Sequence, residues 1–275
     1  MRGEIEMFVR LLNMRIKMLS REKELFFWGM IFPMFLATFL YLAGVNIPEK
    51  LELTHLAVEG TYITKRLIDE QGIHKDIAYF LAIIGLACYI TGFTGIKERE
   101  GMVVKLSARA RRMSLAPIKM STQFLSGLCA NWLVNSGCIV TLIIYIKGIL
   151  GINLVGDLSG WMMTISLGVM LGLILGMIVG SISKWNRAGR QGILATISVG
   201  SGILSGMVDG KLKFYMDYNF PIITKLNPMS FIVDALYTLN VYGMTGRFYM
   251  NIFKLIGAIL IGMMGLMILQ RRNKL

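Results

Sequence analysis

Apolar residues along the chain fall into six runs that are separated by segments rich in charged residues. The runs cover Leu25–Val45, Ile77–Ile96, Ile118–Ile146, Ser159–Ser183, Gly192–Val208 and Ile252–Leu269. A helix needs about 20 apolar residues to cross the ~30 Å hydrocarbon core of a bilayer, and most of the runs have about this length. The pattern therefore predicts an all-α polytopic membrane protein with six transmembrane helices in a single domain, residues 1–275.

The first 23 residues have a different pattern, with an apolar and a polar stripe at helical spacing. The apolar stripe contains Ile5, Val9, Leu12, Ile16 and Leu19, and the polar stripe contains Glu6, Arg10, Asn13 and Lys17. This segment is too charged to span a membrane. We expect residues 1–23 to form an interfacial helix, and a solvated helical tail is the alternative.

The segment Asp209–Asn251, between the fifth and sixth runs, contains the apolar stretch FIVDALYTL. At about ten residues this stretch is too short to span a bilayer. We expect it to form a re-entrant or interfacial helix on the outer side of the membrane.

Composition agrees with a membrane protein, because 55% of the 275 residues are hydrophobic and 16% are charged. The net charge of +13 does not indicate nucleic acid binding, since the basic residues gather at the ends of the apolar runs. Six Lys and Arg residues lie in 1–23, seven in 97–119, three in 184–191 and three after 269, against nine in the intervening segments. This bias predicts a plasma-membrane protein with both termini in the cytoplasm.

The spans contain no Asp, Glu, Lys, Arg or His in their central parts, which argues against an ion-driven carrier. Asn131 and Asn135 are the main polar groups at depth, one helical turn apart on the third run. They could line a substrate path, and hydrogen bonding between helices explains them equally well.

Small residues recur every four positions on the fourth run. The stripe includes Gly168, Gly172, Gly176 and Gly180. Such a stripe lets a neighbouring helix approach closely, so we expect a helix-packing surface.

Signals of catalysis are weak throughout the sequence. The run Ser205–Leu212 resembles a phosphate-binding loop only slightly, because it lacks the first glycine and the hydroxyl residue after Lys211. We expect no ATP site, cofactor site, metal site or catalytic residue in this chain, and therefore no enzyme activity of its own.

The charged segment Lys97–Pro117, between the second and third runs, is cytoplasmic in this topology. Wound as a helix, it places Lys105, Arg109 and Arg112 on one stripe. It begins with alternating charges at Glu98, Arg99 and Glu100. Such a segment can lie on the membrane surface and offer its charges to lipid headgroups or to a cytosolic partner.

The chain resembles the membrane subunits of ATP-binding-cassette (ABC) exporters of the type-two permease class. The resemblance rests on an ordered combination of features: the amphipathic start, Phe32-Pro33, Arg99-Glu100-Gly101, Ala116-Pro117-Ile118, the pattern Pro221, Asn227-Pro228, Asp234, Tyr237, and the basic tail with Arg271 and Arg272.

The resemblance implies that the segment 97–117 contains a coupling helix that is seated on a separate ATPase subunit. Six residues then become candidates for the ATPase interface: Glu98, Arg99, Glu100, Lys105, Arg109 and Arg112. It also implies a second permease subunit, in a homodimer or a heterodimer, and ATP with Mg bound on the ATPase. The exported substrate, whether a drug, peptide, lipid or polysaccharide, is left open. The rival hypothesis is a membrane scaffold or assembly factor without a transport role.

Overall fold

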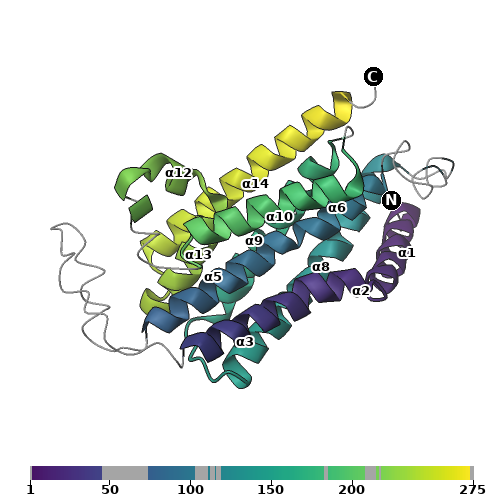
Figure 1. Cartoon of the computed structure of the whole chain (residues 1–275). Coiled ribbons are helices and arrows are strands. Elements are labelled where there is room, and N and C mark those ends of the chain that lie inside the picture. Colours follow the sequence, from purple (N-terminus) through teal and green to yellow (C-terminus); the bar gives the residue numbers. More distant parts are fainter. Residues whose placement is uncertain are drawn as a thin grey trace.

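A computed structural model of the chain describes residues 2–44, 74–102, 119–182, 185–207 and 218–272, and the single residues Arg111, Leu115, Tyr215 and Met216. Within these ranges every regular element is a helix. The helices are α1 (Arg2–Leu19), α2 (Lys23–Phe26), η1 (Phe27–Ile31), α3 (Phe32–Gly44), α5 (His74–Ile90), α6 (Gly92–Glu100), α8 (Met120–Gly148), α9 (Leu158–Gly180), α10 (Arg187–Leu204), α12 (Pro221–Leu226), α13 (Pro228–Tyr242) and α14 (Gly246–Arg272). The long helices run side by side in one bundle (Figure 1). The predicted all-α class is confirmed.

Five stretches of the described chain are long and apolar enough to cross a bilayer. They are Lys23–Ala43, Ile77–Glu100, Ser121–Gly148, Leu158–Gly180 and Gly246–Leu269. They coincide with five of the six predicted spans. The remaining predicted span, 192–208, overlaps α10, which is not among the five because its first turns carry Arg187, Arg190 and Gln191.

The central element is formed by α5 and α6, which follow each other with only Thr91 between them. In the apolar part of Ile77–Glu100, 89% of the residues are buried. In the apolar parts of Lys23–Ala43 and Gly246–Leu269, 22% of the residues are buried. Helices α3, α8, α9, α10 and α13 all pack against this central element. The outer helices expose large apolar side chains such as Phe35, Phe39 and Ile261, as expected for surfaces that face lipid.

In the first spanning stretch, the π-helical turn η1 lies between the α-helices α2 and α3. The wide turn η1 contains an i→i+5 hydrogen bond, in which the Phe32 N–H donates to the Phe27 carbonyl. Pro33 follows directly, and it has no N–H to donate to the Gly29 carbonyl four residues earlier. The wide turn brings Gly29 against α8, where an added Cβ would lie 3.7 Å from the Asn135 Oδ1 atom.

The segment before α14 contains two helices, α12 and α13. The Asn227 side chain caps α13 by accepting from the Met229 N–H (3.1 Å), and it also donates to the Ser201 carbonyl (2.9 Å) at the end of α10. At the other end of α13, Gly243 adopts φ +74°, a conformation that favours glycine. The whole FIVDALYTL stretch lies in α13, which packs against α5, α9 and α14. Its re-entrant or interfacial position stays a prediction.

Candidate functional site: the charged end of the bundle

Charged side chains from α1, α2, α6 and α10 gather at one end of the bundle, which we call the charged end. Its members are Arg15, Glu22, Glu24, Lys97, Glu98, Arg99, Glu100, Arg187 and Arg190. Helix α6 ends here and α10 begins here, and both α1 and the last turns of α14 lie at this end (Figure 1).

The most buried ion pair of the charged end joins α1 to α6. The Arg15 Nη1 atom donates to the Glu98 Oε1 atom, and the two residues are 2% and 6% exposed. The pair lies directly against Gly127 of α8, where an added Cβ would collide with both side chains. A charge buried this deeply is tolerated because its partner neutralises it, so Arg15 and Glu98 lock α1 and α6 together.

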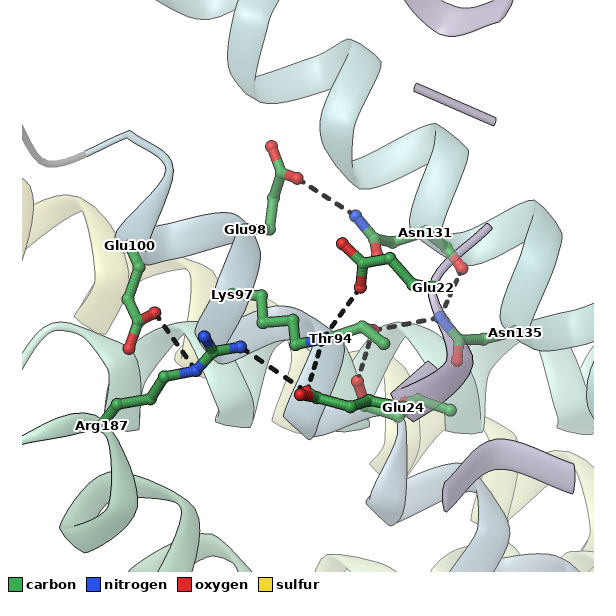
Figure 2. A network of polar contacts seen from close by, with 10 residues as sticks. Glu22, Glu24, Thr94, Lys97, Glu98, Glu100, Asn131, Asn135 and Arg187 are labelled. Carbon is green, nitrogen blue, oxygen red and sulfur yellow. Dashed lines mark hydrogen bonds and ion pairs between the residues drawn. The ribbon is translucent and has the colours of Figure 1, made fainter. Parts of the chain in front are cut away.

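A ladder of polar groups continues from this pair along the interface of α6 and α8, as Figure 2 shows. The Asn131 Nδ2 atom donates to the Glu98 Oε2 atom (3.3 Å) and to the Gly127 carbonyl (2.8 Å). One turn further, the Asn135 Nδ2 atom donates to the Thr94 Oγ1 atom (3.1 Å) and to the Asn131 carbonyl (2.7 Å). Both asparagines are 1% exposed. Hydrogen bonding between helices is therefore one role of this pair.

A second, more exposed set of ion pairs joins α2, α6 and α10, and we call it the ionic bridge. The Lys97 Nζ atom lies 2.9 Å from the Glu22 Oε2 atom and 2.7 Å from the Glu24 Oε2 atom. The Arg187 Nη2 atom lies 3.7 Å from the Glu24 Oε2 atom, and the Arg187 Nε atom lies 3.7 Å from the Glu100 Oε2 atom. Figure 2 shows these contacts around Lys97 and Arg187.

Helix α10 is also held by Arg190, which is 4% exposed. Its Nη2 atom lies 2.8 Å from the Glu100 Oε1 atom, and its Nη1 atom donates to the Gly180 carbonyl (3.3 Å). Arg99, on the α9 side of α6, donates from Nε to the Ser181 Oγ atom (2.9 Å). The last turn of α6 is thus tied to α1, α2, α8, α10 and the end of α9.

The four glycines of the predicted packing stripe on α9 lie against α5 and α6. A Cβ at Gly172 would collide with the Cys88 carbonyl, and a Cβ at Gly176 would collide with the Gly92 backbone. At Gly168 it would lie 3.0 Å from the Cys88 Sγ atom, and at Gly180 3.0 Å from the Arg99 Cβ atom. At Gly172 and Gly176 the backbone of α9 therefore meets the backbone of α5 and α6.

The residues predicted to contact an ATPase fall into two groups. Glu98, Arg99 and Glu100 are largely buried, and each has a partner inside this chain: Arg15, Ser181 and Arg190 respectively. Their role in this arrangement is to fix the end of α6, and a contact with an ATPase stays a prediction. Lys105, Arg109 and Arg112 lie outside the described residues.

Sequence reasoning missed Arg15, Gly127, Thr94 and Arg190. The buried stripe of α1 contains Leu11 and Arg15, whereas Ile5 and Val9 of the predicted apolar stripe are exposed, so the apolar pattern of this helix did not mark Arg15. The four-residue spacing of Gly127, Asn131 and Asn135 was visible in the sequence. The partners of these residues come from distant parts of the chain, and no pattern within one helix identifies them.

No group of three or more His, Cys, Asp or Glu side chains is arranged to hold a metal ion in the described part of the chain. No family model matches the chain, and no curated protein matches it in sequence. Function is therefore inferred from the residues and their geometry.

Proposed function

We propose that the chain is the transmembrane permease subunit of an ABC exporter. It forms a substrate path together with a second permease subunit, and a separate ATPase subunit that holds ATP and Mg drives it. The observation that carries this proposal is the fixation of the last turn of α6. Ion pairs and hydrogen bonds tie this turn to four neighbouring helices and to the end of α9.

This fixation matters because the last turn of α6, Lys97–Glu100, is also the start of the charged segment that runs to Pro117. A force applied to that segment from the cytosol reaches α6 first. From there it reaches α1 through Glu98, α2 through Lys97 and α10 through Glu100. The charged end is thus suited to convert movement of an external partner into movement of the spans.

The proposal counts α10, the fifth in chain order, as a span, which brings the number of spans to six. Its 18 residues give a length of about 27 Å, close to the thickness of a bilayer core. It packs along α5, α6, α9 and α13. An even number of spans returns the chain to the side on which it began, and both α1 and the last turns of α14 lie at the charged end in Figure 1. With the Lys and Arg bias, this supports a cytoplasmic charged end.

Site-directed photo-crosslinking tests the proposal. A photo-reactive amino acid is placed at Ser107, in the charged segment, and in a separate protein at Leu158, which is 77% exposed at the start of α9. We expect a nucleotide-binding ATPase to be crosslinked in cells from position 107 and not from position 158. Mass spectrometry identifies the crosslinked partner.

Recovery of other membrane proteins from both positions, with no nucleotide-binding protein from position 107, would overturn the proposal. That result would favour the scaffold hypothesis instead.

A further inference from the structure

A narrow crevice lies beside the polar ladder, between η1, α6, α8 and α10. It is lined by Trp28, Gly29, Phe93, Thr94, Asn135 and Gln191, and Glu24 and Lys97 lie at its mouth. Its free space of about 10 Å³ has room for a group the size of one water molecule. Figure 2 shows Thr94 and Asn135 beside the end of the Lys97 side chain, which contacts Glu22 and Glu24.

The Asn135 Oδ1 atom in this crevice is buried and has no hydrogen-bond partner in the described part of the chain. The orientation of the amide is fixed by its neighbours, because the Nδ2 atom donates to the Asn131 carbonyl and to the Thr94 Oγ1 atom, which itself donates to the Thr91 carbonyl. A flipped amide would place its oxygen against a carbonyl oxygen. A buried acceptor without a hydrogen-bond partner is unfavourable, so the crevice favours a group that donates a hydrogen bond.

The walls and the mouth of the crevice add two further preferences. The rings of Trp28 and Phe93 lie 5.3 Å apart, centroid to centroid, and are tilted by 32°. Aromatic faces of this kind attract flat rings and cations. At the mouth, the Glu22 and Glu24 carboxylates bind the Lys97 ammonium. The same two carboxylates can bind another cation when Lys97 moves away.

We propose that this crevice is a binding subsite for an aromatic molecule that carries a positive charge and an N–H donor, which enters from the charged end when Lys97 releases Glu22 and Glu24. The inference rests on the proposed function, because it names the chemical class of the exported molecule. In the arrangement seen here the subsite is closed, since only a water-sized space is left. The ionic bridge is the closure.

Binding to the purified full-length chain, without any ATPase, tests the subsite. Two probes with the same charge are compared by isothermal titration calorimetry. Ethidium is an aromatic cation with amino N–H donors, and tetraphenylphosphonium is an aromatic cation without them. For Asn135→Leu we expect ethidium to bind about tenfold more weakly than to the wild type. Binding of tetraphenylphosphonium should change by less than about twofold, because it makes no hydrogen bond to the lost oxygen.

Equal ethidium affinity for the wild type and Asn135→Leu would overturn the subsite, and so would equal loss of both probes. The second result would show that Asn135 acts only through the packing of the bundle.

Thiol labelling provides a test in which Asn135 is unchanged. A Cβ at Gly29 makes only ordinary contacts, the nearest at 3.7 Å, so Gly29→Cys fits the crevice, and Cys138→Ala removes the thiol beside it. We expect ethidium to slow maleimide labelling at position 29, read by mass spectrometry, and Lys97→Met to speed it. Lys147→Met, at an exposed position beyond the opposite end of α8's apolar stretch, should leave the rate unchanged.

Labelling at position 29 that is insensitive to both ethidium and Lys97→Met would overturn the proposal. Because no ATPase takes part, a negative result here is separate from failure of the crosslinking at Ser107, which tests the proposed function itself.

Discussion

Helix α6 has two sides that are built in opposite ways. Toward α9, glycines on both helices remove the side chains, so that a Cβ at Gly95 would collide with the Leu173 carbonyl and one at Gly176 with Gly92. Toward α2, α8 and α10, polar and charged side chains fill the interface, a crevice remains, and the Asn135 Oδ1 atom has no partner within the described residues. One side is closed by backbone contact, and the other is held by a few directional bonds.

The difference indicates which parts of the bundle can move. Densely packed interfaces do not deform gradually, because any displacement creates voids or collisions. The pair α6 and α9 is therefore expected to move as one body. The ion pairs that join Lys97 of α6 to Glu22 and Glu24 at α2 are partly exposed, so they can break and reform at low cost. We expect opening of the bundle to separate α2 and η1 from α6 and to leave the glycine interface intact.

The largest effect is expected from a side chain placed in the glycine interface. Gly176→Leu would force the α9 backbone away from Gly92, and overpacking that shifts the backbone costs about 1–3 kcal/mol and sometimes more. We expect loss of the folded protein from detergent extracts, measured by the size-exclusion profile and the melting temperature.

The matched control is Gly200→Leu on α10, where an added Cβ would meet nothing within 4 Å. It should fold like the wild type. Ile174→Leu is a poorer control, because Ile174 is 2% exposed and packs against Gly262 of α14. If Gly176→Leu and Gly200→Leu are equally stable, the glycine interface is not rigid and the comparison fails.

The second effect concerns the buried pair of Arg15 and Glu98. Removal of one partner leaves a buried charge, which costs about 3–5 kcal/mol, whereas replacement of both by apolar residues is often close to neutral. We expect Arg15→Met to lower the melting temperature strongly and Arg15→Met with Glu98→Met to recover most of it. Arg10→Met, at an exposed position on the same helix, should have little effect.

A double variant as unstable as Arg15→Met alone would show that the two charges do not compensate each other. The buried pair would then not be the lock between α1 and α6.

The two sides of α6 also differ in how far the sequence predicts them. The glycine stripe is a local pattern with a four-residue period, and the sequence identified both the residues and their packing role. Five helices that are long and apolar enough to cross a bilayer were likewise visible as apolar runs. The polar side was predicted only in part: Asn131 and Asn135 stood out as polar residues at depth, but the ion pairs that Glu98 and Glu100 form inside the chain were missed. Their partners Arg15 and Arg190 are 83 and 90 positions away along the chain, and such pairings depend on the fold. The predicted contact of Glu98 and Glu100 with an ATPase stays a prediction.

The smallest effect on stability is expected at the ionic bridge. The side chains of Lys97, Glu22 and Glu24 are 20%, 35% and 61% exposed, and ion pairs of this kind contribute about 0–1 kcal/mol. Lys97→Met should therefore lower the melting temperature far less than Arg15→Met, although both remove a cation with a carboxylate partner on a neighbouring helix.

The remaining difference in melting temperature between Lys97→Met and the wild type should shrink as salt is raised from about 0.05 M to 1 M, because screening acts on exposed pairs first. The deficit of Arg15→Met should persist at high salt, since its partner Glu98 is shielded from solvent. If Lys97→Met destabilises the protein as much as Arg15→Met, and salt does not change this, then the ionic bridge is a structural lock rather than a closure that can open, and the polar side of α6 is as rigid as its glycine side.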